Sequence, residues 1–469
     1  MNDVFDTQHL YKSYFKMALP VVLGLAVTLI YNLADTYFIA RTGNTDLIAG
    51  VSLCAPVFTT LMGFGNIFGQ GGSSLISRFL GEKNLEKTRS VSSFCFYGAI
   101  GTGVLVALIL TVFSTQFLTL LGADADTLIH AYSYYSILSI CAPIMVVSFV
   151  HQNLIRCEGL SAESMMGTII GAVVNIILDP ILISVAGMGA AGAAIATVIG
   201  YLCSVVFYLY IVVKKTKGLS LRLKDCAITP DHAKQLFGIG GTAALSNLMQ
   251  SVTVILTNQY LLPYGNDRIA AMGVVMKITM IAVLVLVGFS FGGVPVFGYL
   301  YGAKRNDELK KLVRFCLCFL SAISLALTVV LFVSADSVIG MFLSDAALIE
   351  IGVPMLRYQV AGTVFVGVVQ LLTVLFQATG KVLPSFILSI SRQGVVFFAA
   401  IVVCAQLFGY QGVLMGQAAA DVLSAIIAVV LFYLYMRRYC DCLSENNGLT
   451  DTKKKRSRYG IFWLADKNP

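Results

Sequence analysis

The sequence has 469 residues, of which 58% are hydrophobic and 12% are charged, and its formal net charge is +8. A soluble domain carries about 25% charged residues, so this composition excludes an ordinary soluble protein and indicates that lipid surrounds most of the chain. The lysines and arginines lie in short segments between apolar runs, which is a pattern of membrane topology and does not indicate a nucleic-acid partner.

Twelve apolar runs are long enough to span a membrane, because a helix of about 20 residues crosses the hydrocarbon core. The first run continues for spanning length, so we expect no cleavable signal peptide. The sequence therefore predicts an all-α integral membrane protein with twelve transmembrane helices. Their approximate limits are 15–40, 48–77, 92–114, 130–156, 164–186, 190–214, 234–262, 269–300, 312–334, 351–379, 384–407 and 412–437.

Basic residues alternate between the two sides of the predicted helices. They gather in loops that follow even-numbered helices, for example from Lys214 to Lys224, and in the tail from Lys453 to Arg458. Loops after odd-numbered helices carry mostly aspartate and glutamate, such as Asp124 and Asp126. Positive loops stay in the cytoplasm, so the sequence predicts that both termini are cytoplasmic.

The chain also repeats itself at an interval of 220 or 221 residues. The segment from Gly71 to Lys83 resembles the segment from Gly292 to Lys304. An interval of six helices keeps the same orientation, so the repeats are parallel. We expect two six-helix lobes that rock about a central cleft, as in an alternating-access transporter. The expected parts are a cytoplasmic N-terminus (1–14), a first lobe (15–214), a cytoplasmic linker (215–233), a second lobe (234–437) and a basic cytoplasmic tail (438–469).

Polar residues in the apolar helices of the first lobe fall at one depth. Counted along the helices at 1.5 Å per residue, they lie roughly 5–18 Å below the outer surface. A charge at such depth is costly, which makes it a functional hypothesis. The group comprises Asp35, Asn175, Asp179, Thr197 and, one turn from Thr197, Ala193. Their oxygens are hard ligands suited to Na⁺ or H⁺. We expect a cation-coupling site, with Na⁺ held by Asp35, Asn175, Asp179 and Thr197 if sodium is the ion.

Neutralising Asp35 would remove its need for hydration, and the first helix could then bend at Pro20, the expected hinge. In the second lobe, Lys277 and Asp421 lie at similar depths and are expected to form an ion pair, whose role is either structural or in transport. Aromatic and methionine side chains suit flat lipophilic cations. The candidate cleft residues are Tyr31, Phe64, Met145, Phe149, Met276, Met280 and Phe289.

Several motifs resemble the multidrug and toxic compound extrusion (MATE) family across nearly the whole chain. The most specific are the run from Val174 to Ile183, which contains Asn-Ile-Ile-Leu-Asp-Pro, and the Gly189-Ala-Ala-Gly192 pattern that follows it. The resemblance implies a V-shaped arrangement of the lobes and efflux of cationic and amphipathic drugs by antiport with Na⁺ or H⁺. It places the cation ligands on the same five residues, and the chain in a bacterial cytoplasmic membrane.

Other classes of function remain as alternatives. Flipping of lipids or lipid-linked glycans belongs to the same superfamily of folds, but such proteins often have additional helices and a strongly cationic cavity. An enzyme is not expected, because the four histidines are scattered and supply no catalytic set. No cofactor is expected, and the lack of a phosphate-binding Walker loop argues against ATP as the direct energy source. Membrane lipids are the expected neighbours, and a monomer is sufficient.

Overall fold

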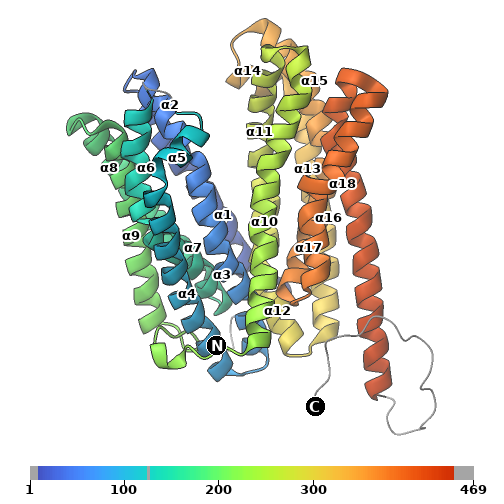
Figure 1. The fold of residues 1–469 in the computed structure, drawn as a ribbon. Helices are drawn as coiled ribbons and strands as arrows, with labels where there is room; N and C mark the ends of the chain where they lie inside the picture. Colours follow the sequence, from blue (N-terminus) through green and yellow to red (C-terminus); the bar gives the residue numbers. More distant parts are fainter. Residues whose placement is uncertain (1–8, 124–126, 448–469) are drawn as a thin grey trace. The chain divides into compact units, whose positions relative to one another are not determined.

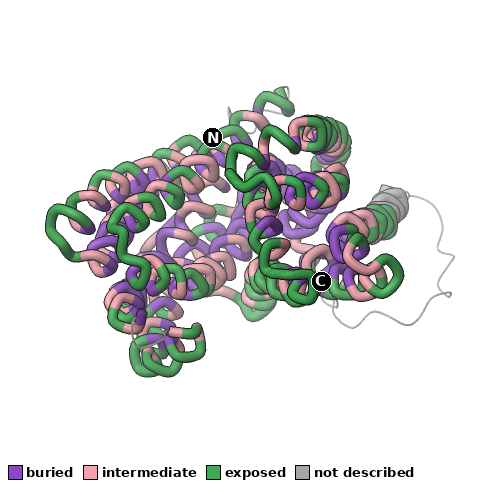
Figure 2. Tube along the Cα trace, turned by 90° about the horizontal axis from the view of Figure 1, so that it is seen from above, coloured by how far each residue is buried: buried purple, intermediate pink, exposed green. Residues whose placement is uncertain are grey.

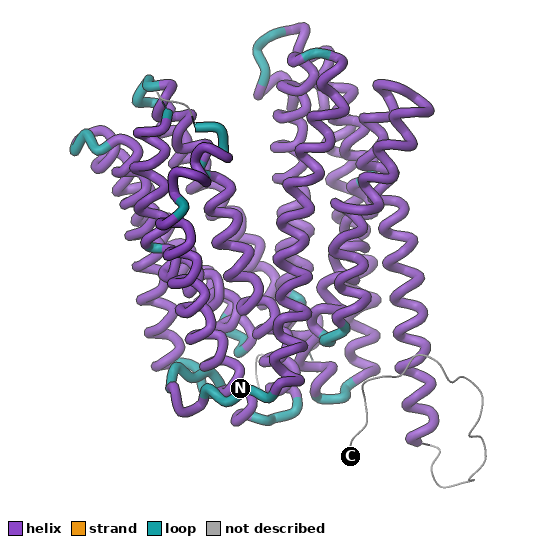
Figure 3. The backbone as a smooth tube through the Cα atoms, in the orientation of Figure 1, coloured by secondary structure: helices purple, strands orange, loops and turns teal. Residues whose placement is uncertain are grey.

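The computed structural model describes residues 9–123 and 127–447, and every regular element in these ranges is a helix (Figure 3). Residues up to Ala428 form one compact unit, and the chain from Val429 onward forms a second, of which the last part of α18 is described. Three parts of the predicted topology lie outside the described residues. They are the beginning of the expected cytoplasmic N-terminus, the acidic residues Asp124 and Asp126, and the expected basic tail after Asn447.

The first half of the chain contains nine α-helices. They gather on one side of the molecule, and α10 to α17 gather on the other (Figure 1). Their bounds are α1 Leu10–Ala40, α2 Thr45–Leu53, α3 Ala55–Gly81, α4 Leu85–Val112, α5 Ser114–Leu120, α6 Leu128–Ile140, α7 Ala142–Cys157, α8 Ser161–Asp179, continued by the π-helix η1 Pro180–Val185, and α9 Gly189–Lys214.

The second half begins after the short 3₁₀ turn η2 Leu223–Asp225. Its elements are α10 Pro230–Leu261, η3 Leu262–Tyr264, α11 Asn266–Gly292, α12 Val294–Gly302, α13 Asn306–Val333, α14 Ala335–Phe342, α15 Ala346–Ala361, α16 Thr363–Ala378, α17 Val382–Ile390, the π-helix η4 Ser391–Val395 and α18 Val396–Asn447. Helix α10 begins four residues before the expected run, because Pro230 suits a first helical position and the Thr229 hydroxyl caps the His232 N–H.

The described helices agree with twelve membrane crossings. Nine continuous segments of the described chain are long and apolar enough to cross, and two bent pairs, α6 with α7 and α15 with α16, raise the number to eleven. The segment Val382–Tyr435 has 54 residues, far more than the roughly 20 that one crossing needs. Gly409, with a φ of +57°, breaks the helical backbone inside it and divides it into two crossings.

Matching backbone features mark the internal repeat. Lys83 and Lys304 both adopt a left-handed conformation, with φ of 60° and 56°, although neither is a glycine. Gly159 and Gly380 do the same, with φ of 86° and 73°. The members of each pair are 221 residues apart, so the repeat seen in the sequence is also a repeat of backbone conformation.

Buried apolar residues form separate cores. One core joins α2 to α9 through residues such as Leu61, Leu75 and Leu154, and another joins helices of the second half through Val275 and Leu356. Figure 2 shows the buried residues inside the helix groups and exposed residues around them. Most buried apolar residues of each half thus pack within that half, and Leu236 of α10 also joins the first core.

The segment between α9 and α10 is attached to the first half. The Glu158 carboxylate, which follows α7, accepts backbone N–H groups of Lys217 at 3.0 Å and Leu219 at 2.9 Å. On α4, the hydroxyls of Ser93 and Tyr97 donate to backbone carbonyls further along the same segment. The expected linker is thus an ordered strap on the surface of the first half.

Candidate functional site

The polar cluster at the end of α8 is the feature that the sequence predicted. Asp179, Asn175 and Thr197 are buried, and Asp179 is 0% exposed. The Asn175 amide lies 3.4 Å from both Asp179 Oδ1 and Thr197 Oγ1, and in its alternative orientation it donates to Asp179 Oδ2 at 3.3 Å. In either orientation Asn175 bridges α8 to α9. Three of the five predicted coupling residues therefore meet directly.

The local helix geometry at this cluster follows from Pro180. Proline has no N–H to give to the preceding turn, so the α-helix cannot continue regularly past Asp179. The chain passes instead into the π-helical turn Pro180–Val185. Single π-turns inside helices occur frequently at functional sites. The Asp-Pro pair therefore gives α8 an irregular turn directly after the buried Asp179.

Asp35 lies on α1, which packs against α8, the helix that carries Asn175 and Asp179. Within the described part of the chain, the buried Asp35 Oδ1 accepts no hydrogen bond. A buried carboxylate oxygen without a hydrogen-bond donor is an arrangement that a cation or a proton would stabilise. Ala193 is fully buried on α9, one turn before Thr197, and the role of its carbonyl oxygen stays a prediction.

Two tyrosines near the carboxylates were not predicted. Tyr134 is buried on α6, which packs against α9, the helix that carries Thr197. The Tyr201 hydroxyl lies 3.2 Å from that of Tyr31. Tyr134 belongs to a helix with several tyrosines, so nothing in its local pattern distinguished it from packing residues.

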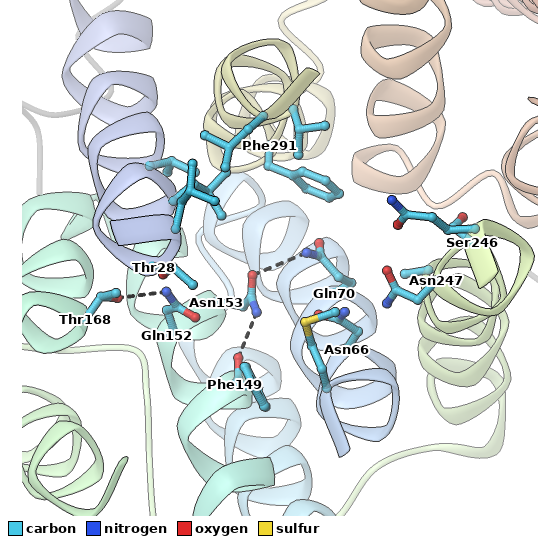
Figure 4. A pocket seen from close by; sticks show the side chains of 18 of the residues that line it. Thr28, Asn66, Gln70, Phe149, Gln152, Asn153, Thr168, Ser246, Asn247 and Phe291 are labelled. Carbon is cyan, nitrogen blue, oxygen red and sulfur yellow. Dashed lines mark hydrogen bonds between the residues drawn. The ribbon is translucent and has the colours of Figure 1, made fainter. Parts of the chain in front are cut away.

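A cavity of about 520 Å³ lies beside the cluster. It is lined by α1, α3, α7, α8 and α9 from the first half and by α10, α11, α16, α17 and η4 from the second. Asn175 and Thr197 belong both to its wall and to the carboxylate cluster. Amide side chains are frequent in the wall, and Figure 4 shows Gln70 bonded to Asn153 and Gln152 bonded to Thr168. Among its described lining residues, the ionisable side chains other than tyrosine are Arg156 and Arg392, and no carboxylate belongs to the lining.

The predicted cleft residues divide into two groups. Tyr31, Phe149 and Met280 line the cavity. The other four do not line it: Met145 is 0% exposed in the first core, Phe64 and Met276 pack against the cores, and Phe289 packs against the rings of Phe15 and Phe319. Helix packing uses the same apolar side chains as a drug cleft, so composition alone did not separate the two uses.

The predicted ion pair of the second half is wrong in one partner. Asp421 Oδ1 accepts from Arg392 Nε at 2.8 Å and from Gln417 Nε2 at 3.1 Å, whereas Lys277 is exposed. Depth along a helix does not fix the direction in which a side chain leaves the helix, so matching the depths of Lys277 and Asp421 was not enough to pair them. Arg392 reaches Asp421 from the π-helical turn η4, which the sequence did not reveal.

Comparison with known proteins identifies the family. The model of the MatE family matches residues 20–181 and again 242–403. The chain belongs to the MATE family. The double match agrees with the internal repeat. The multidrug export protein MepA of Staphylococcus saprophyticus is 31% identical over 92% of this chain and 96% of that protein. MepA of Staphylococcus aureus (strain N315) is 30% identical over 94% of this chain and 97% of that protein.

Solved MATE structures share the fold. A crystal structure of a MATE protein in the bent conformation superposes with a TM-score of 0.87 at 23% identity and covers 95% of this chain and 99% of that one. The predicted all-α membrane fold of two six-helix repeats is confirmed. As a MATE-family membrane transporter the chain is not an enzyme, in agreement with the sequence analysis.

Proposed function

We propose that this MATE protein exports amphipathic and cationic compounds by antiport with Na⁺ or H⁺. The names of its relatives support multidrug export. The observation that carries the antiport is the contact of Asn175 with Asp179 and Thr197 beside the cavity, with the unpartnered Asp35 on the neighbouring helix α1. Asn175 and Thr197 belong both to this cluster and to the wall of the cavity. Binding of a coupling ion at the cluster would therefore disfavour binding of a substrate in the cavity. Binding of the ion needs oxygen donors, which carboxylate, amide, hydroxyl and the Ala193 carbonyl supply.

Alternating access would follow from neutralisation of the cluster. Asp35 lies on α1, and Pro20 lies inside the same helix. Because Pro20 removes one backbone hydrogen bond, we propose it as the point where α1 bends when Asp35 loses its charge. The lobes 15–214 and 234–437 would then rock about the cavity, with both termini in the cytoplasm of a bacterium. One chain contains both lobes, so a monomer suffices, with membrane lipids around it. Flipping of lipids is the less favoured function, since the curated relatives are named for drug export.

The experiment is efflux from proteoliposomes. The substrate is tetramethylrhodamine methyl ester, a fluorescent lipophilic cation, under an imposed pH gradient and separately under a Na⁺ gradient. We expect one gradient to drive export by the wild type, and Asp35→Asn to lose that response by at least about tenfold, since the variant cannot exchange a charge. Asp46→Asn, which changes an exposed aspartate in α2, is the matched control and should pump normally. Equal export by Asp35→Asn would contradict coupling at this cluster.

A further inference from the structure

Arg156, near the end of α7, holds its guanidinium group rigidly in the wall of the cavity. Its Nε donates to the Gln152 carbonyl oxygen at 3.0 Å and to Ser164 Oγ at 3.2 Å. Within the described residues, no atom accepts a hydrogen bond from its two terminal Nη groups. The group is therefore anchored through Nε, and its two Nη groups are available to a molecule in the cavity.

The acids closest to Arg156 in the sequence are engaged elsewhere. Glu158 accepts backbone N–H groups of the strap, and Glu163 Oε1 lies 3.1 Å from Lys215. Among the described residues, Arg156 has no carboxylate partner.

The second arginine of the wall differs in this respect. Arg392 is paired with the buried Asp421 at 2.8 Å, so its charge is compensated. The position related to Arg156 by the internal repeat is Gln377, which lines the same cavity with a neutral amide. The uncompensated positive charge of Arg156 thus lies on the wall formed by the first half. The equivalent position on the wall of the second half carries the neutral Gln377.

A guanidinium with two parallel donors matches the two oxygens of a carboxylate. A charge held away from bulk water without a partner is unfavourable, and a ligand carboxylate would relieve that cost. Phe149, Tyr201 and Phe291 offer ring surfaces in the same cavity, whose volume is in the range that holds a drug-sized molecule. We propose that Arg156 binds the carboxylate of aromatic, zwitterionic or acidic substrates, so that the transporter handles such compounds in addition to cations. This inference deepens the proposed export function and rests on it.

The test compares two probes that differ in one group. Tetramethylrhodamine carries a free carboxylate, and tetramethylrhodamine methyl ester has the same ring system without that charge. Binding is measured by fluorescence polarisation with the full chain in nanodiscs. We expect Arg156→Gln to raise the Kd of the acid at least about tenfold, as the loss of a charge-assisted pair implies, and to leave the Kd of the ester within about twofold. Arg222→Gln, an exposed arginine in the strap, is the matched control and should change neither Kd.

Each other result has a defined meaning. Equal weakening of both probes by Arg156→Gln, or no change in either, would overturn the proposal, because a structural arginine does not distinguish acid from ester. If Arg156→Gln does not fold, Arg156→Lys keeps the charge but loses the two parallel donors. A fall of at least about threefold in its preference for the acid supports the site, and an unchanged preference overturns it. The two proposals can also fail separately. If acid binding depends on Arg156 but neither gradient drives export of the ester by the wild type, the carboxylate site stands and the proposed cation antiport is wrong.

Discussion

At the scale of single residues, two glycines determine how closely α8 and α9 approach. A Cβ on Gly200 would lie 2.7 Å from the Gly171 carbonyl oxygen, and a Cβ on Gly171 would lie 2.2 Å from Ser204 Oγ. Small residues allow membrane helices to pack backbone against backbone. This contact lies one turn from Asn175 and Thr197, so it sets the distance that the bridging amide must span.

Gly200→Ala is therefore expected to separate α8 from α9 and to weaken coupling. The added methyl group meets backbone, which cannot rotate away, and the cost of such overpacking is about 1–3 kcal/mol. Thermal unfolding in nanodiscs and the gradient-driven efflux assay would measure both effects. Gly101→Ala is the control, because a Cβ there has no atom within 4 Å. Identical behaviour of the two variants would show that the close approach of α8 to α9 is unimportant.

At the scale of elements, the strap between α9 and α10 depends on one buried carboxylate. Glu158 is 8% exposed and accepts backbone N–H groups of three consecutive residues, Lys217, Gly218 and Leu219. Consecutive N–H groups with a common direction attract an anion, and the carboxylate satisfies donors that no helix or sheet uses. The strap is ordered by this contact and by hydroxyl groups of α4.

Glu158→Ala should release the strap. Leaving buried N–H donors without an acceptor costs about 1–3 kcal/mol, and trypsin should then cleave after Lys217 or Arg222 faster than in the wild type. Glu163→Ala removes a carboxylate from the partly exposed pair with Lys215, which should contribute at most about 1 kcal/mol, and serves as the comparison. Equal protease sensitivity of the two variants would contradict the role assigned to Glu158.

At the scale of the whole transporter, repeat-related contacts join the two halves at the end near α12. A Cβ on Gly81 would lie 2.2 Å from the Tyr299 carbonyl oxygen, and one on Gly302 would lie 2.0 Å from that of Arg78. Because Gly81 and Gly302 are equivalent in the repeat, α3 and α12 cross with approximate twofold symmetry. Beside this crossing, the Ser74 hydroxyl of α3 donates to the Gln377 carbonyl of α16, another helix of the second half. The halves therefore meet backbone to backbone at one end of the cavity.

Gly302→Ala is expected to weaken that closure. The new methyl group would force α12 away from α3, and amide hydrogens in residues 78–84 and 299–305 should exchange several-fold faster with solvent. Hydrogen-exchange mass spectrometry of the variant in nanodiscs would detect the change. Gly273→Ala, in α11 with no atom within 4 Å, should leave exchange in both segments as it is. If exchange in the Gly302→Ala variant also matches the wild type, the contact does not hold this end closed.

The sequence predicted those features that depend on position along a helix. Asn175, Asp179 and Thr197 were brought together because residues at one depth on neighbouring helices must meet if they are polar and the surroundings are apolar. The same reasoning failed for Lys277, since depth does not give the direction of a side chain around the helix. It also missed the partner of Asp421, because Arg392 is redirected by a π-helical turn that no pattern of residues announced.

Cavity residues were harder to predict than the cation cluster. A carboxylate in an apolar helix stands out, whereas tyrosine, phenylalanine and methionine are ordinary packing residues. Tyr134 was missed and Met145 was wrongly assigned for this reason. The amides of the wall, such as Asn153 and Gln70, carry no charge and so did not stand out, although they line the cavity.

The anchored strap has a mechanical consequence for the second half. Ser90 on α4 donates to the carbonyl of Ala227, and α10 begins at Pro230. Only Ile228 and Thr229 therefore connect the attached Ala227 to the first residue of α10. Two residues extend by about 7 Å at most. Ile228 also packs against the first core, which shortens the free part of this connection further. The start of α10 is consequently fixed to the first half. Helix α10 can rotate about this point, but its first residues cannot move away from the first half.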